Sequence, residues 1–411
     1  MPVLNLIWVS FFLLAFLVSL AKLLFWGQTD IFVQVVQAIF EMSKLSFEIS
    51  LGLVGIMSFW LGLMRVGEKG GFLTAATRFL QPLFQKIFPA IPEGHPAFGA
   101  MLMNVSANML GLDNAATPMG LKAMKELQSL NPQKDTASNA QILFLVINTS
   151  SVTLFPVTIF FYRAQQGAAD PTDVFIPILI ATFVASLVGL ISVAFVQRIN
   201  LLDTTVLTYL GGMTAGIGGL LFYFSGLDQE SMQAQSAFIS NFILFSVIVV
   251  FISGTALKRI NVYDEFIEGA KEGFKVAINI VPFLVAMLVA IGVFRASGAL
   301  DLLLDGVRWV LAGLGWDLRF IEALPTALMK PLSGSGARSL MIETMQTHGA
   351  DSFAGRLASV MQGSTETTFY VIAVYFGAVG IRHVRHAVAC GLLADFAGIF
   401  TAIFITYFFF G

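Results

Sequence analysis

Charged side chains are scarce in this sequence. Of its 411 residues, 12% are charged and 57% are hydrophobic, and the mean hydropathy is +0.82. A soluble domain carries about a quarter charged residues, so the composition excludes that class. Apolar runs of roughly 20 residues without strand-like alternation predict an all-α, polytopic helical membrane protein that lies in a lipid bilayer.

Features that mark several other classes are also missing. The single cysteine, Cys390, excludes an internal disulfide, and a net charge of −2 gives no sign of nucleic-acid binding. The sequence has no phosphate-binding loop, Gly-x-Ser-x-Gly turn or visible nucleophile–base pair, so we expect no enzyme activity. His383 and His386 have helical ligand spacing but lie in a basic loop without cysteine or acidic neighbours. We therefore predict no metal site and no cofactor beyond a coupling Na⁺ or H⁺.

A polar stretch interrupts the apolar run 357–376. The six residues from Gly363 to Thr368 are polar or weaken a helix, and one of them is Glu366. Unpaired polar groups in hydrocarbon are costly, so such a break indicates a cavity on a substrate or ion path. Ser150–Val157 aligns without a gap with Ser364–Val371. The chain is therefore predicted to contain two related halves, each with a broken transmembrane helix.

Each half also contains two apolar arms that are too short to cross a bilayer. In the first half, Pro96–Leu110 and Ala115–Leu127 flank the tip Gly111–Asn114. In the second half, residues 321–329 and 339–345 flank the tip Lys330–Arg338. Two short arms joined by a polar tip predict a re-entrant hairpin in each half.

The complete pattern predicts nine crossings. Uninterrupted spans are expected at residues 6–26, 47–64, 174–196, 205–224, 237–252, 276–294 and 387–410, broken spans at 142–162 and 357–376, and interfacial stretches at 31–46, 72–88, 258–275 and 298–316. The span 205–224 has no counterpart, and its glycines suit close helix packing. It reverses the second half, so the domains 1–200 and 233–411, connected by 201–232, form an inverted repeat.

Loop charges predict the orientation. Lysine and arginine concentrate in the loops near residues 65–69, 122–134, 198, 258–259 and 382–385, whereas the loops 165–173 and 226–233 carry only acidic charges. Positive loops stay in the cytoplasm. We expect a multi-pass protein of the cytoplasmic (inner) membrane with its N-terminus inside and its C-terminus outside.

Two carboxylates fall at membrane depth. Glu366 lies one helical turn from Gln362 and Tyr370, so the three are expected to share a helix face. Glu366 can bind a cation, accept a hydrogen bond from a substrate or carry a proton, and a structural salt bridge is the alternative, with the candidate partners Lys330, Arg338 and Arg356. Asp395, in the last span, is the other carboxylate, with local hydrogen bonding as its alternative.

The two hairpin tips offer different chemistry. The first presents amide, carboxylate and hydroxyl oxygens that can line a cavity or simply cap a helix. The second, Ser333–Gly336, can direct backbone N–H groups at an anionic or electron-rich ligand, with Lys330 and Arg338 beside it. A flexible turn with basic side chains that reach the interface is the alternative.

These stretches resemble a known family. Asn108–Met124 resembles the spore-maturation A proteins, and Pro331–Arg338 and Met361–Val371 resemble the spore-maturation B proteins, so the chain looks like a head-to-tail fusion of the two. Both belong to the nucleoside-recognition (Gate) domains, which also occur in concentrative nucleoside transporters and in the membrane part of ferrous-iron transporters of the FeoB type. The resemblance implies an inverted repeat of two Gate domains whose hairpins meet at the midplane.

The resemblance also implies site residues. In the nucleoside transporters, both hairpins and both broken helices bind the nucleoside, and the first hairpin with its broken helix supplies a sodium site. By position, the substrate-binding candidates, taken together with Arg338 beside the second tip, are Asn108, Asp113, Asn114, Asn148, Ser150, Ser151, Ser333, Ser335, Gln362, Ser364, Thr365, Glu366 and Thr367. The ion-binding candidates are Asn114, Thr117, Thr149 and Thr153.

We therefore expect a secondary active transporter for a small polar solute, nucleoside-like or a small organic anion, coupled to Na⁺ or H⁺. The alternative is a non-transporting membrane scaffold or assembly factor in envelope or spore maturation. The sequence leaves open the oligomeric state, including a homo-oligomer.

Overall fold

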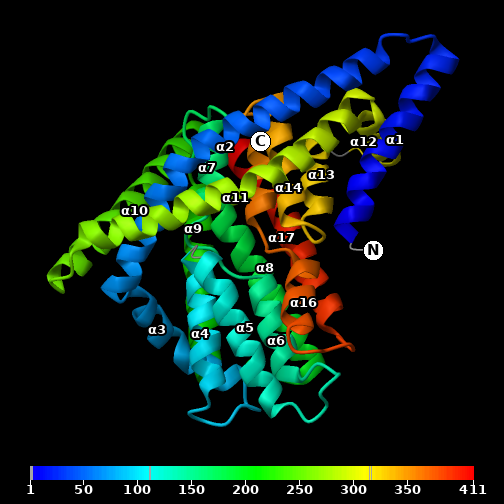
Figure 1. The fold of residues 1–411 in the computed structure, drawn as a ribbon. Helices are drawn as coiled ribbons and strands as arrows, with labels where there is room; N and C mark the ends of the chain where they lie inside the picture. The colour runs from blue at the N-terminus through cyan, green and yellow to red at the C-terminus, as the bar shows by residue number, and fades with distance from the viewer. Residues whose placement is uncertain (1–2, 111–112, 314, 316) are drawn as a thin grey trace.

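The computed structural model describes the chain apart from residues 1–2, 111–112, 314 and 316, together with the side chains of 3–4, 113–115 and 277 (Figure 1). The elements in chain order are α1 (Val3–Trp26), α2 (Ile31–Gly70), α3 (Phe72–Ile87), α4 (Pro96–Met109), α5 (Asp113–Leu130), α6 (Asn139–Thr149), α7 (Val157–Gln165), α8 (Phe175–Gln197), α9 (Thr204–Ser225), α10 (Gln229–Leu257), α11 (Val262–Ala296), α12 (Ala299–Ala312), the 3₁₀ helix η1 (Arg319–Ala323), α13 (Leu324–Met329), α14 (Gly334–His348), α15 (Phe353–Gly363), α16 (Thr368–Gly377) and α17 (Ala387–Phe410). The described residues form no strand, and seven of their helices (α1, α2, α8, α9, α10, α11 and α17) are long and apolar enough to cross a membrane. The protein is an all-α, polytopic membrane protein, as the sequence predicts.

Both broken spans are confirmed. The first is divided into α6 and α7, and the second into α15 and α16, with the breaks at residues 150–156 and 364–367. The leading pieces α6 and α15 are both 11 residues long. Each begins after a serine N-cap, since Ser138 accepts a hydrogen bond from the Gln141 N–H at 3.3 Å and Ser352 accepts one from the Gly355 N–H at 3.0 Å. The two halves therefore start and interrupt this helix in the same way.

The first hairpin is formed by α4 and α5, as predicted. In the second hairpin, η1 and α13 form the entering arm, but the returning helix α14 begins at Gly334 rather than at Ser339. The predicted start at Ser339 was wrong because Ser333 is the N-cap of α14. Its hydroxyl accepts a hydrogen bond from the Gly336 N–H at 3.0 Å. Most of the predicted Gly/Ser tip is therefore the first turn of α14.

Two predicted boundaries between interfacial and spanning segments do not exist. The segments 31–46 and 47–64 belong to one 40-residue helix, α2, and most of 258–275 joins 276–294 in the 35-residue helix α11. A change of polarity along a helix does not end it, because a helix stops only where its last carbonyls find other partners. In α2 that occurs at Gly71, whose φ of 85° places it in the left-handed region.

The long helices α2 and α11 cross in opposite directions. A Cβ on Gly269 would lie 2.4 Å from the Leu61 carbonyl oxygen, and a Cβ on Gly292 would lie 2.4 Å from the Met42 side chain. Residue numbers therefore rise along one helix as they fall along the other. Glycine permits this backbone approach, and an ion pair of 2.9 Å between Arg65 and Glu265 joins the same two helices.

The equivalent helices α8 and α17 repeat this arrangement with small residues. The position of a Cβ on Gly189 lies 3.2 Å from the Ala394 Cβ, and that of a Cβ on Gly398 lies 3.2 Å from the Ala185 Cβ. This pair is also antiparallel. Because both pairs of corresponding helices meet in opposite directions, the two halves form the predicted inverted repeat.

The unpaired span α9 lies at the side of the bundle. Val206 and Phe224 are its buried residues, and the Tyr209 hydroxyl donates a hydrogen bond to the Phe79 carbonyl at 2.5 Å. No atom lies within 4 Å of a Cβ built on any of its glycines at 211, 212, 216, 218 and 219. The expectation that these glycines serve close helix packing was wrong within the described part of this chain.

Candidate functional site

The two helix breaks touch each other in the middle of the molecule. The backbone N–H of Glu366, in the second break, donates a hydrogen bond of 2.8 Å to the carbonyl oxygen of Thr149, at the end of α6. Figure 1 shows α4, α5 and α6 in the lower half of the molecule and α13 and α14 in the upper half. The hairpins thus approach this point from opposite ends.

Each hairpin is bonded to the broken helix of its own half, at the break in the first half and at the first turn of α16 in the second. The Leu154 N–H donates to the Met109 carbonyl at 2.9 Å, and the Phe369 N–H donates to the Pro331 carbonyl at 3.0 Å. These bonds satisfy backbone groups that a broken helix would otherwise leave unpaired in the membrane. They also make each hairpin and its break one connected unit.

An amide side chain repeats this connection in both halves. Asn148 and Gln362 are the next-to-last residues of α6 and α15. The Asn108 amide of α4 donates to Asn148 Oδ1 at 2.9 Å, and the Gln362 amide donates to the Gly334 carbonyl of α14 at 3.4 Å. These amides, just before the two breaks, therefore hold the hairpins in position.

A polar cavity of about 100 Å³ lies where these elements meet. Its lining comes from both halves: Asn108, Thr153, Phe155, Pro156, Val157, Thr158 and Ile159 from the first, and Lys330, Gly334, Arg338, Gln362, Gly363, Thr365 and Glu366 from the second. Sites for small molecules usually measure roughly 300–1,000 Å³. The cavity in this conformation has room for a few water molecules, so a larger solute requires it to open.

The charge around this cavity is uneven. Lys330, which is buried, and Arg338 bring positive charge, whereas Glu366 brings a carboxylate. The cavity also borders Gly334 at the positive N-terminal end of α14. The Arg338 guanidinium lies 5.5 Å from the centre of the Tyr162 ring. This lining can bind a polar solute that carries an anionic or electron-rich group.

A second cavity of about 210 Å³ adjoins the first and shares Val157, Thr158 and Arg338 with it. Its other walls are apolar and aromatic, and include Trp60 of α2 and Phe161 of α7. Arg338 therefore stands between a polar compartment and an aromatic one.

The structure brings only some of the candidate residues together. Around the polar cavity lie Asn108, Thr153, Arg338, Gln362, Thr365 and Glu366. Ser150 and Ser151 instead line a separate, mostly apolar cavity with Leu83 and Phe84.

The remaining candidates lie next to the cavity or outside the described residues. The hydroxyls of Thr149 and Ser364 donate to carbonyls of their own helices, at 3.0 and 2.8 Å. Ser333 and Ser335 lie at the start of α14 with their hydroxyls 3.3 Å apart, and Thr367 packs against Gly334. Thr117 is half-buried on α5, and the side chains of Asp113 and Asn114 lie outside the described residues.

Two expectations about Glu366 were wrong. The helix ends at Gly363 and resumes at Thr368, so Glu366 shares no helix face with Gln362 and Tyr370. The Tyr370 side chain is 57% exposed and is not in the cavity lining. Arg356 is not its partner either, because Arg356 pairs with Asp173 at 2.7 Å.

Tyr375 of α16 is a residue of this region that was not among the candidates from the sequence. Its hydroxyl accepts a hydrogen bond from the Asn104 amide at 3.2 Å and donates one to Asn148 Oδ1 at 3.4 Å. A tyrosine within an apolar helix was the available signal, since a buried hydroxyl needs a partner. This network ties α16 of the second half to the first hairpin.

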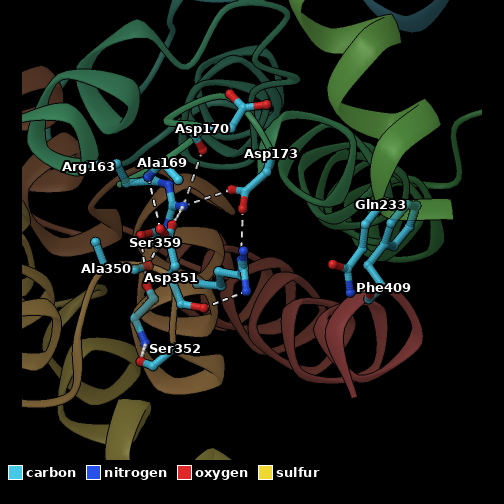
Figure 2. A network of polar contacts seen from close by, with 12 residues as sticks. Arg163, Ala169, Asp170, Asp173, Gln233, Ala350, Asp351, Ser352, Ser359 and Phe409 are labelled. Atoms are coloured by element: carbon cyan, nitrogen blue, oxygen red, sulfur yellow. Dashed lines mark hydrogen bonds and ion pairs between the residues drawn. The ribbon is translucent and has the colours of Figure 1, made fainter. Parts of the chain in front are cut away.

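A buried ion network, also unpredicted, closes one end of the molecule (Figure 2). The Arg163 side chain, at the end of α7, is 0% exposed and pairs with Asp173 at 2.8 Å and with Asp351 at 3.1 Å. It also donates to the Ala350 carbonyl at 2.8 Å. Asp351 follows α14, so the network joins a loop of the first half to a loop of the second.

Backbone hydrogen bonds close the opposite end. The Ala137 N–H donates to the His383 carbonyl, and the His383 N–H donates to the Asp135 carbonyl, both at 3.0 Å. His386 lies 3.0 Å from the Gln197 amide, and burial together with the nearby Arg385 charge lowers the pKa of its imidazole. Within the described residues no group of three His, Cys, Asp or Glu side chains could hold a metal ion.

Comparison with known proteins gives matches over both halves. The model of the Gate family, described as nucleoside recognition, matches residues 50–165 and 277–382. Spore maturation protein B of Bacillus subtilis (strain 168) is 45% identical over 177 residues, which cover 42% of this chain and 98% of that protein. Spore maturation protein A of the same organism is 38% identical over 187 residues, which cover 46% of this chain and 92% of that protein. No solved structure matches the chain.

Proposed function

Because the chain belongs to the Gate family of nucleoside recognition domains, as its resemblance to a fused pair of spore-maturation proteins predicted, we propose that it is a secondary active transporter. It moves a small polar solute, nucleoside-like or a small organic anion, by alternating access. The polar cavity carries this proposal, since residues of both halves line it at the point where both hairpins and both breaks meet.

The contacts of the hairpins support a mechanism. Each hairpin is bonded to its own break, so a hairpin and its broken helix move as one unit. Opening towards one side separates the Arg163 network, and opening towards the other side separates the hydrogen bonds between Asp135, Ala137 and His383. Only one end opens at a time, and the solute site then faces one side after the other.

The proposal includes the division into repeats, the orientation in the membrane and the coupling ion. The repeats are residues 1–200 and 233–411, with residues 201–232 as the connecting segment. The protein lies in the inner membrane with its N-terminus inside and its C-terminus outside. Na⁺ or H⁺ drives transport, and Thr117, Thr149, Thr153 and Asn114 are the candidates for an ion site in the first half.

The test is a ligand panel on purified protein. Thermal stability is measured with nucleosides, nucleobases and small carboxylates, in Na⁺ and in K⁺, at two pH values. A ligand at 100 times its dissociation constant stabilises the folded state by about 2.7 kcal/mol. We expect at least one solute to raise the melting temperature, and Gln362→Ala and Glu366→Gln to remove that shift.

Gln346→Ala is the matched control for Gln362→Ala. Its amide bonds to Gln166 at 2.9 Å on the surface, away from the cavity, so the solute response should be retained. A positive solute is then tested for uptake into proteoliposomes under an ion gradient. Binding without uptake in any gradient would contradict transport.

A membrane scaffold is the second candidate, and one observation favours it. The amides of Asn104, Asn108 and Asn148 are bonded to one another or to Tyr375, as in a structural core, although Asn108 also lines the polar cavity. A scaffold predicts a flat ligand panel in both ions. It also predicts that Gln362→Ala and Glu366→Gln support maturation of the host envelope or spore as well as the unmodified protein does.

A further inference from the structure

One carboxylate in the membrane core has no hydrogen-bond partner. Asp395, in the middle of α17, is 1% exposed, and neither of its carboxylate oxygens accepts a hydrogen bond. A buried polar group without a partner is strongly destabilising, and more so within a membrane. Such a group therefore points to a ligand that completes its environment.

Two threonines at the second break, Thr365 within it and Thr368 at the start of α16, are in the same state. Thr365 is 4% exposed and Thr368 is 0% exposed, and neither hydroxyl has a hydrogen-bond partner. Both threonine hydroxyls lie close enough to the Asp395 carboxyl to stabilise its negative charge, but neither forms a hydrogen bond of standard geometry with it. Four buried oxygen atoms without partners, from three side chains, thus gather at one place.

The packing of α17 places these side chains against each other. Gly391, Asp395 and Gly398 are spaced to share one helix face. A Cβ on Gly391 would lie 2.7 Å from Thr368 Cγ2, and a Cβ on Gly398 would lie 2.9 Å from Thr365 Cγ2. The two glycines bring the threonines onto the helix surface on either side of the carboxylate.

We propose that Asp395, Thr365 and Thr368 form a sodium site. Carboxylate, hydroxyl and carbonyl oxygens are the ligands of hard cations. The Ser364 carbonyl, 3.3 Å from the position of a Cβ on Gly398, lies at the same edge. The charges of Lys330, from the second hairpin, and of Glu366, from the break, act on Asp395 in opposite directions.

This site lies in the second half and is distinct from the ion candidates of the first half. Thr365 also lines the polar cavity, so a bound sodium ion would fix the break beside the solute. Its role as the coupling ion rests on the proposed transport function. Its existence as a binding site does not.

The test is a sodium titration of the purified full chain without solute. Melting temperature is measured in NaCl, KCl and choline chloride at equal ionic strength. We expect a saturable rise in Na⁺ and no comparable rise in K⁺ or choline. Thr365→Val and Thr368→Val should weaken the apparent sodium affinity by about 10-fold or more, and Asp395→Asn should abolish the response.

Thr406→Val is the matched control, because Thr406 is also on α17, is 0% exposed and has a hydroxyl without a partner. It should leave the sodium response unchanged. If Asp395→Asn does not fold, the two threonine variants decide the outcome. No sodium response, a response that all three variants retain, or a rise in melting temperature with falling pH that depends on Asp395 but not on Na⁺, would each overturn the site.

The titration also separates the two proposals. A failed sodium response with a positive solute panel leaves transport standing with another coupling ion. A sodium response with a flat solute panel leaves the ion site standing without a transported solute.

Discussion

Equivalent side chains in the two halves have taken different tasks. Asn148 and Gln362 occupy the same position in α6 and α15 and both hold a hairpin. The Asn148 side-chain oxygen accepts hydrogen bonds from Asn108 and Tyr375, whereas the Gln362 side-chain oxygen is buried without a partner beside the cavity. The first half therefore uses its amide for structure, and the second half leaves its amide available for a solute.

This difference predicts unequal stability losses. Asn148→Ala removes the acceptor of the Asn108 amide and of the Tyr375 hydroxyl, which keeps only its hydrogen bond from Asn104, and this loss should cost about 1–3 kcal/mol. Gln362→Ala removes one long hydrogen bond and should cost less than about 1 kcal/mol. Thermal unfolding in detergent measures both, and equal losses would argue against this division of roles.

His386 predicts a pH dependence of stability. Burial and Arg385 lower the pKa of its imidazole below 6.5, the ordinary value. As pH falls through 6.5, the unfolded chain binds a proton that the folded chain does not, so stability decreases. His386→Gln should therefore lose less melting temperature between pH 7.5 and 5.5 than the unmodified protein. An identical decrease in both proteins would contradict this account.

Polar positions could be predicted from the sequence, but their partners could not. The break around Glu366 is visible because a bilayer tolerates such residues only where they are satisfied or line a cavity. Which side chain meets which depends on packing between distant segments. The Asp395 pocket, for example, depends on Gly391 and Gly398, whose importance appears only when α17 lies against the second break.

At the scale of the elements, breaks were predictable and continuations were not. The ends of α6 and α15 follow from local residues such as Ser138, Ser352 and Gly363. The continuity of α2 and α11 does not, because the change from amphipathic to apolar character resembles a boundary although no cap is present. The 40 residues of α2 are stabilised by packing along α11 rather than by local signals.

The crossing of α2 and α11 predicts a contrast between two glycines. Gly269→Ala would place a Cβ 2.4 Å from the Leu61 carbonyl oxygen and force the helices apart, at a cost of about 1–3 kcal/mol. Gly55→Ala, on α2, meets no atom within 4 Å and should be neutral or stabilising by up to about 1 kcal/mol. Melting temperatures of the two variants test this, and a Gly269→Ala protein as stable as Gly55→Ala would refute the close crossing.

On the scale of the whole molecule, the two ends are closed by different interactions. One end has the Arg163 network and the other has backbone hydrogen bonds between loops. An inverted repeat relates the two ends by symmetry, yet position 377, which corresponds to Arg163, is a glycine. A substitution in the Arg163 network can therefore weaken the closure of one end without changing the contacts that close the other.

Arg163→Met should destabilise the protein by about 3–5 kcal/mol, because it leaves Asp173 and Asp351 without their buried partner. Arg163→Lys should recover part of this loss, since one ammonium cannot reach every group that the guanidinium contacts. Asp351→Asn, at a side chain that is 37% exposed, should cost less than either. Thermal unfolding ranks the three variants, and an Arg163→Met protein as stable as Asp351→Asn would show that the network is not a structural lock.

The single unpaired helix α9 has a consequence for how such a chain is made. Spore maturation proteins A and B, which this chain resembles, are two separate proteins, and two separate membrane chains would each need their own signal for the direction of insertion. In one continuous polypeptide, the odd helix makes that choice for the second half, because each crossing reverses the direction of the next. One continuous polypeptide also provides the two halves in equal numbers.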